Sequence, residues 1–171
     1  KVGIRSDGIM EAVGSHRLTP GVEHKRSVYY DQEQTFIVVD YLQSATTKNY
    51  IQRFHLAPDF SVTKKSVRET IATHSSGRTL TAVQLYAPNG ITEEVGTSHV
   101  AYRDYTWVSR PELMYKQRGS NVRYMTLMHL GKTADDTITY SDIKRDGSYY
   151  VVNYKTSSSN AMKTIRFSAA W

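Results

Sequence analysis

The sequence predicts an all-β fold, an antiparallel β-sandwich of about ten to twelve short strands. Residues that favour strands are abundant, with 15 Val against 8 Leu, 18 Thr and 13 Tyr. Short segments of alternating polarity recur at roughly the 8–12 residue spacing of sandwiches and barrels, whereas helical periodicity is scarce. A length of 171 residues fits one domain, so we expect a single β-sandwich over residues 1–171. Because the chain starts at Lys1 without an initiator Met, we expect it to be part of a longer protein.

The first half of the chain contains five predicted strands. Each is rich in β-branched or aromatic residues and is bounded by polar residues; they are residues 22–30, 35–42, 50–56, 66–73 and 80–86. Residues 31–34 and 75–77 have the composition of turns, so they are expected to join neighbouring strands.

The second half contains five more predicted strands, at residues 112–116, 121–130, 137–143, 148–155 and 162–167. Alternation is clearest in the second and fourth of these, which predicts half-buried strands. In the fourth, Tyr150, Val152 and Tyr154 share one face. Loop composition at residues 118–121, the Asp146-Gly147 dipeptide and the polar stretch 157–160 predict turns between them.

The chain carries a net charge of +6, from 22 basic and 16 acidic residues. This charge suits an acidic partner, but no polybasic block is present, which weakens a nucleic-acid interpretation. The sequence contains no run of about 18 apolar residues, so it predicts no membrane-spanning helix. The absence of cysteine excludes disulfides, thiol catalysis and cysteine-based zinc sites.

The six histidines form no recognisable metal or catalytic motif. No H-x-H or H-E-x-x-H pattern occurs among His16, His24, His55, His74, His99 and His129. G-x-S-x-G and phosphate-binding glycine patterns are also absent. We therefore predict no catalytic residue and no metal or other cofactor within this chain, its histidines forming hydrogen bonds within or beside the sheet.

Asp40 directly follows four apolar residues of a predicted core strand, at positions 36–39. An unpaired buried carboxylate would be costly, so a partner is required. We predict a structural pairing with His24, Arg26 or the amides of a turn.

Residues 87–110 are predicted to be a long loop, because Pro88, Gly90 and Gly96 interrupt them. Aromatic faces stack on sugar rings and Arg binds carboxylate or sulfate groups bidentately. The candidate substrate-binding residues are therefore Tyr102, Arg103, Tyr105, Trp107 and Arg110. The same loop could instead be a lid over the core or a contact with a neighbouring domain.

Several stretches resemble the β-sheet domain of the heparinase II/III-like polysaccharide lyases. Residues 12–18, 22–30 and 36–42 match its order and spacing, and Phe54-His55-Leu56-Ala57-Pro58 is similar to the element that follows in that family. From residue 60 onward the resemblance is only architectural. Residues 43–49 depart from the family, whose members often have Gly and His there, so no substrate contact is transferred to them.

The resemblance implies the later part of a C-terminal β-sandwich that follows an α/α-toroid in a secreted or cell-envelope enzyme of bacterial type. It implies β-elimination on anionic, uronic-acid polysaccharides such as glycosaminoglycans. The catalytic Tyr and His, and any zinc or calcium, would belong to the part of the protein upstream of this chain. His16, His24 and Asp40 match family positions that look structural, so this chain alone is expected to be inactive.

Two other classes of protein fit the same residues. A free-standing carbohydrate-binding β-sandwich would hold glycan through Tyr102, Tyr105 and Trp107 without reaction. A structural domain of jelly-roll type would show neither glycan affinity nor activity.

Overall fold

The computed structural model describes residues 1–64, 66, 68–87, 90–101, 106–159 and 161–170, and this part of the chain is built of antiparallel strands without a helix. The larger sheet has the strand order β1-β2-β3-β4-β9-β7-β6-β5, with β8 also paired to β9. Its strands are β1 (Val2–Ile4), β2 (Met10–His16), β3 (Val22–Tyr30), β4 (Thr35–His55), β5 (Phe60–Lys64), β6 (Glu69–His74), β7 (Thr79–Gln84), β8 (Thr92–Ala101) and β9 (Trp107–Gly131).

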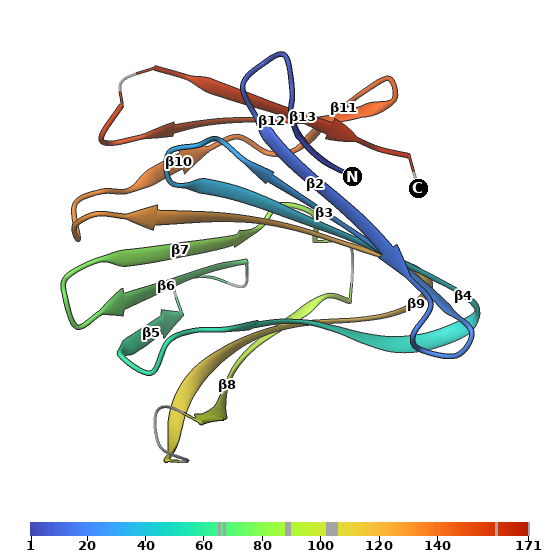
Figure 1. Cartoon of the computed structure of the whole chain (residues 1–171), viewed down its shortest axis with the longest axis horizontal. Coiled ribbons are helices and arrows are strands. Elements are labelled where there is room, and N and C mark those ends of the chain that lie inside the picture. The colour runs from blue at the N-terminus through green and yellow to red at the C-terminus, as the bar shows by residue number, and fades with distance from the viewer. Residues whose placement is uncertain (65, 67, 88–89, 102–105, 160, 171) are drawn as a thin grey trace.

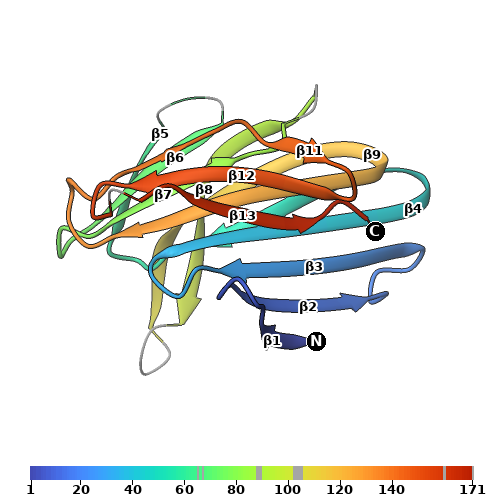
Figure 2. The same ribbon diagram turned by 90° about the horizontal axis from the view of Figure 1, so that it is seen from above.

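The smaller sheet packs on one face of the larger one (Figures 1 and 2). It consists of β10 (Ile138–Tyr140), β11 (Lys144–Asp146), β12 (Tyr149–Thr156) and β13 (Lys163–Ser168). Alternate residues of the facing strands form the main core, including Ile37, Val39, Tyr41, Met125, Leu127, Val152, Tyr154, Ile165 and Phe167. The predicted inward face of residues 148–155 is confirmed, because Tyr150, Val152 and Tyr154 are all buried.

Strands β4 and β9 are both long and both double back at the same end of the molecule (Figure 1). Their pairing is irregular between Gln43 and Lys48, and regular on either side. The first half of β4 and the second half of β9 lie with β1–β3 and β5–β7 in what we call the main layer. Residues 48–55 of β4, residues 107–119 of β9 and strand β8 form a second layer, which we call the flap.

Polar contacts hold the bend between the main layer and the flap. The hydroxyl groups of Ser44 and Tyr50 lie 2.6 Å apart, and the hydroxyl of Tyr124 donates to the carbonyl of Tyr50 at 2.9 Å. Tyr50 therefore fixes the start of the flap against both strands of the main layer.

A second core fills the space between the flap and the main layer. Near the bend it contains Val22, Tyr50, Tyr115, Val122 and Tyr124. Further from the bend it contains Leu56, Ala72, Leu80, Ala82 and Leu113. The protein is thus a stack of three layers, with the main layer in the middle (Figure 1).

The bend explains how the predicted strands combine. The prediction for residues 22–30 matches β3, whereas residues 35–42 and 50–56 are two halves of one strand, as are residues 112–116 and 121–130. The turn predicted at residues 118–121 is wrong, because β9 continues through them. Pairing with β4 on both sides supplies the backbone hydrogen bonds that a turn would otherwise have provided.

The long loop predicted over residues 87–110 is also wrong in its described part. Residues 92–101 form β8, which pairs with residues 107–116 of β9 as a two-stranded ribbon. One face of this ribbon is largely exposed, so its sequence lacks the apolar character used to recognise core strands. The short or exposed strands β1, β2, β5 and β11 were not predicted for the same reason.

Candidate functional site

Asp40 is the centre of a buried polar network in the main layer. Its side chain accepts hydrogen bonds from Nε2 of His24 at 2.6 Å, from Nε and an Nη of Arg26 at 2.7 and 2.8 Å, and from Nε2 of Gln52 at 2.7 Å. Burial opposes ionisation, but the hydrogen bonds from His24, Arg26 and Gln52 and the charge of Arg26 outweigh it and lower the pKa of Asp40. The predicted structural pairing of Asp40 is confirmed.

The network continues through the interior from Gln52. Oε1 of Gln52 accepts from the hydroxyl of Thr126 at 2.7 Å, and Nε2 of Gln84 donates to the same hydroxyl oxygen at 3.2 Å. Oε1 of Gln84 then accepts from the backbone N–H of Met125 at 2.8 Å. Because Gln52 lies in the flap and Asp40 in the main layer, the network fastens the two layers together.

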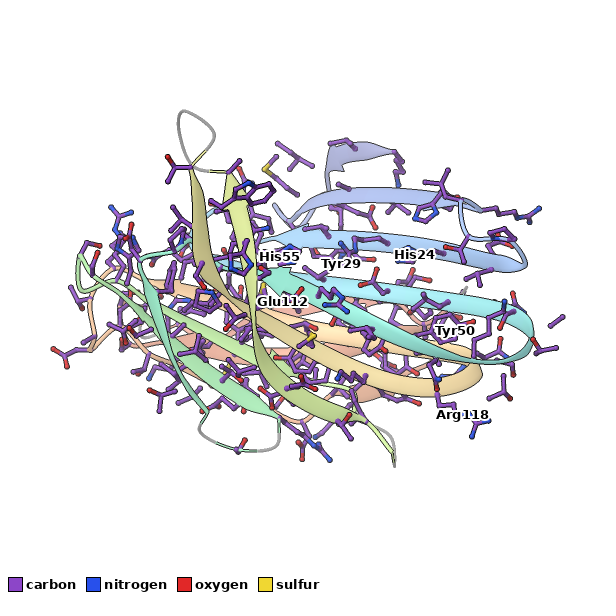
Figure 3. The ribbon with its side chains drawn as sticks, turned by 90° about the horizontal axis from the view of Figure 1, so that it is seen from below. His24, Tyr29, Tyr50, His55, Glu112 and Arg118 are labelled. Atoms are coloured by element: carbon purple, nitrogen blue, oxygen red, sulfur yellow. The ribbon has the colours of Figure 1, made fainter. Side chains whose placement is uncertain are left out.

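Toward the surface the network ends at His24 (Figure 3), which is paired with His16. Nδ1 of His24 lies 3.0 Å from Nε2 of His16, and the two rings meet edge to face. A carboxylate only accepts hydrogen bonds, so Nε2 of His24 carries the proton shared with Asp40. Nδ1 of a neutral His24 then accepts from His16. This geometry orients both rings through hydrogen bonds, and it is not the arrangement of a metal site.

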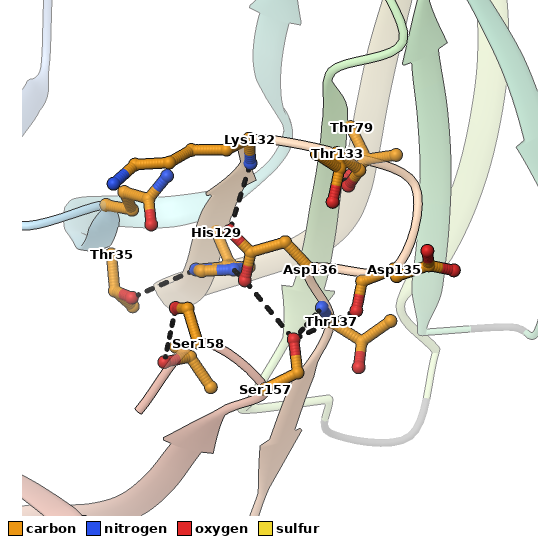
Figure 4. Close-up of polar contacts among 12 residues, drawn as sticks. Thr35, Thr79, His129, Lys132, Thr133, Asp135, Asp136, Thr137, Ser157 and Ser158 are labelled. Carbon is orange, nitrogen blue, oxygen red and sulfur yellow. Dashed lines mark hydrogen bonds and ion pairs between the residues drawn. The ribbon is translucent and has the colours of Figure 1, made fainter. Parts of the chain in front are cut away.

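Two further histidines are also paired with carboxylates. Nε2 of His55 lies 2.7 Å from Oε1 of Glu112, which also accepts from Arg53 at 2.9 Å (Figure 3). His129 is fully buried, with its nitrogens 3.2 Å from the hydroxyl of Thr35 and 3.4 Å from Asp136 (Figure 4). Over the described residues, no group of three or more acidic or histidine side chains is arranged to hold a metal ion.

The structure separates the two predicted substrate-binding residues that it describes. Trp107 is 71% exposed at the end of the β8–β9 ribbon, whereas Arg110 is half-buried and its Nε donates to the hydroxyl of Ser98 at 3.2 Å. Their register places them on opposite faces of β9, so one ligand would not lie between them. Tyr102, Arg103 and Tyr105 lie outside the described residues.

A broad apolar surface lies on the side of the main layer that faces the flap. In Figure 3, strands β1–β3 lie beside the flap and are not covered by it. The register between neighbouring strands puts the side chains of this surface on one face. We call it the open face, and its members are Val2, Ile4, Met10, Ala12, Val28, Tyr30, Phe36, Met128 and Leu130.

The open face is hollowed by two grooves. One of about 470 Å³ runs over β1–β3 beside His16 and His24. The other, of about 500 Å³, runs between Phe36 and Leu130 of the main layer and residues 53–55 of the flap, with Leu56 directly after them. Val2 and Ile4 are 78% and 65% exposed, which is unusual for aliphatic side chains that lie in a continuous patch.

Sequence reasoning did not identify the open face. Its members come from five strands, and only the register brings them together. The one available signal was the alternation of Val28, Tyr30, Phe36 and Val38 with residues that face the smaller sheet. Both faces of β3 and β4 are apolar, as expected for strands with a layer on each side.

Solved structures share this arrangement of strands. A heparan sulfate lyase, HepC, from Pedobacter heparinus aligns with 94% of the chain, with a TM-score of 0.78 and 15% identity. A structure of heparinase III aligns with 98% of the chain, with a TM-score of 0.74 and 15% identity. A heparinase III gene product aligns with 94%, with a TM-score of 0.73 and 12% identity. The chain spans only about 26% of the length of each of these proteins.

The fold and the family pattern agree on the class of protein, the C-terminal β-sheet domain of polysaccharide lyases. The sequence pattern described as heparinase II/III-like, C-terminal, matches residues 5–122. The chain therefore belongs to the heparinase II/III-like family. No curated protein matches it significantly. Its described residues include no helix that is long and apolar enough to cross a membrane.

Proposed function

We propose that this chain is the C-terminal domain of a polysaccharide lyase that cleaves anionic, uronic-acid glycans by β-elimination. The observation that carries the proposal is the family match over residues 5–122, together with the alignment of nearly the whole chain to about a quarter of each heparin or heparan sulfate lyase. The remaining part of such an enzyme would supply the proton-transfer groups. The enzyme would act in the periplasm or outside the cell, where its polymeric substrate is found.

In this proposal the domain supports the catalytic part and lines the cleft. Three histidine–carboxylate pairs centre on Asp40, Glu112 and Asp136. Their hydrogen bonds are made to each other and to other groups of this domain, which favours a structural role for them. The open face offers an apolar surface of the kind that packs against another folded part of the same protein. An α/α-toroid upstream of this chain is the proposed occupant, because the matched lyases carry about three quarters of their length outside the aligned part.

The experiment that tests the proposed function compares the complete parent protein with the 171-residue chain. Each is incubated with heparan sulfate and with other uronic-acid polymers, and the unsaturated product is followed by its ultraviolet absorbance. We expect product with the parent protein and none with the chain alone. A parent protein that releases no unsaturated product from any uronic-acid polymer would contradict the proposal.

A second candidate, a carbohydrate-binding module without enzymatic activity, is favoured by Trp107. An indole side chain that is 71% exposed on a projecting ribbon is suited to stacking on a sugar ring. If this ribbon lines the cleft of a lyase, Trp107→Ala should raise the KM of the parent enzyme and leave its Tm nearly unchanged. If the chain is a binding module, the same change should weaken glycan binding by the isolated chain.

A further inference from the structure

One pocket of about 480 Å³ lies apart from Trp107 and from the Asp40 network, near the end of β9. Its apolar part is formed by Ala57, Phe60 and Leu130, and the ring of Phe60 meets His74 edge to face at 5.1 Å. Arg78 and Lys132 also line it. The volume is within the range of roughly 300–1,000 Å³ that is usual for small-ligand sites.

The charges around this pocket favour an anion. Arg78 and Lys132 are exposed, and their side chains form no ion pair with an acidic residue in the described part of the chain. Glu33 is the acidic residue in the lining, and its carboxylate is already bound by Nζ of Lys163 at 2.6 Å. His74 lies 3.9 Å from the exposed carboxylate of Asp59. The two unpaired cations therefore determine the charge that a ligand would meet.

The loop that carries Lys132 is held in place by the buried cluster around His129 (Figure 4). Asp136 accepts a hydrogen bond from the backbone N–H of Lys132 at 3.0 Å, and the hydroxyl of Thr79 donates to the carbonyl of Thr133 at 3.2 Å. Gly131 lies so close to Thr79 and Asp136 that no side chain would fit there. A fixed backbone lowers the entropy cost of binding, because the loop need not become ordered.

We propose that this pocket binds one acidic sugar unit of the glycan, through its carboxylate or sulfate group. Arg78 and Lys132 bind the anionic group, and the C–H face of the sugar packs on Phe60 and Leu130. The inference rests on the proposed function, since it takes its ligand class from there, and it adds a binding site that does not involve the β8–β9 ribbon. Because Leu130 also lines the groove on the open face, the pocket opens beside the surface assigned to the upstream domain.

The test measures binding of heparan sulfate oligosaccharides of defined length to the 171-residue chain by calorimetry at physiological ionic strength. The double variant Arg78→Ala/Lys132→Ala should weaken binding about tenfold or more, because two charge-assisted contacts are lost. The matched control, Lys144→Ala/Arg145→Ala, removes the same charge from exposed positions on β11 and should change the Kd less than about threefold. An equal loss of affinity in both variants would mean that the glycan is attracted to the net charge of the chain. That result would overturn the proposed binding site.

A second measurement separates the apolar part of the site from its charge. Phe60→Leu should weaken binding several-fold at high salt as well as at low salt, because packing contacts are not screened. Phe60 is only partly buried against the second core, so the Tm should fall by no more than a few degrees. No binding by the wild-type chain, or no effect of either pocket variant, would overturn the inference. That result would leave the proposed function standing if the parent protein still cleaves uronic-acid polymers. If the parent protein cleaves no uronic-acid polymer, the proposed function itself is wrong.

Discussion

At the scale of single residues, buried carboxylates join separate parts of this protein. Asp40 joins the main layer to the flap through Gln52, and Asp31 joins the two sheets through the hydroxyl of Tyr154 at 2.8 Å. Oδ1 of Asp31 also accepts from three successive backbone N–H groups at residues 33–35. Each carboxylate thus satisfies several donors that burial would otherwise leave unpaired.

Replacing Asp40 should destabilise the protein substantially. Asp40→Ala removes the acceptor of His24, Arg26 and Gln52, so we expect a loss of about 2–4 kcal/mol in the free energy of unfolding. Urea denaturation checks this value. The control is Asp135→Ala, an exposed position where the change should be within about 0.5 kcal/mol. Equal stability of the two variants would mean that the network makes no net contribution to the free energy of unfolding.

The same two carboxylates should make stability depend on pH in the acid range. For both Asp31 and Asp40 burial opposes ionisation, yet hydrogen bonds outweigh it and lower the pKa. Their contribution is therefore fully present above the unfolded value of about 3.9 and is lost as the pH falls toward the lower folded value. We expect the free energy of unfolding to fall below about pH 4, with a smaller fall in Asp31→Asn. An identical pH profile for that variant would refute the assignment.

At the scale of elements, the close packing at the end of β9 depends on a residue without a side chain. A Cβ atom at Gly131 would lie 2.3 Å from Oγ1 of Thr79 and 2.5 Å from the carbonyl oxygen of Asp136. Neither atom can move away freely, because Thr79 is buried in β7 and the other is backbone. This junction fixes where the loop after β9 crosses to the smaller sheet.

Gly131→Ala should consequently lower the free energy of unfolding by about 1–3 kcal/mol, as overpacking does elsewhere. Chemical denaturation of the variant provides the measurement. Gly14→Ala serves as the control, because nothing lies within 4 Å of a Cβ there and its conformation suits any residue. A Gly131 variant as stable as the Gly14 variant would show that the loop relaxes without cost.

The alternation of apolar residues predicted the strands that have a buried face, but it did not predict how β4 and β9 double back. Residues 44–47 are small and mostly polar, and residues 118–121 have the composition of an ordinary turn. Whether such a segment ends a strand or bends it depends on pairing between residues far apart in the chain. The ribbon of β8 was missed because solvent covers one of its faces. At the candidate site, two partners of Asp40, His24 and Arg26, were predicted and Gln52 was not, whereas the open face and the pocket beside Lys132 depend on register.

At the scale of the whole molecule, the open face differs from an ordinary protein surface because its exposed apolar side chains lie together. Val2, Ile4 and Met10 extend it to the edge of the sheet, where β1 has a neighbour on one side only. Patches of this kind usually mark interaction surfaces. The 171-residue chain should therefore expose apolar surface that the parent protein covers.

Binding of the dye ANS tests this expectation. The 171-residue chain should increase ANS fluorescence, and Ile4→Ser should reduce the increase without lowering the Tm, because Ile4 contributes little to the core. Leu18→Ser removes an even more exposed side chain, 84% against 65% for Ile4, from the connection between β2 and β3 outside the open face, and should leave the fluorescence unchanged. Equal effects of the two changes would mean that the dye does not recognise this surface.

The doubling back of β4 and β9 also constrains the order of events in folding. Paired residues of the two strands are separated by 94 positions in the main layer, at Thr35 and His129, and by 57 in the flap, at His55 and Glu112. Such distant pairing raises the contact order, which slows folding. Since β9 lies beside β4 in both layers, the flap cannot be completed on the ribosome before residue 119 has emerged, nor the main layer before residue 131. The first eighty residues therefore cannot complete either layer alone. Until β9 is synthesised, the edge of β4 that β9 will occupy remains exposed.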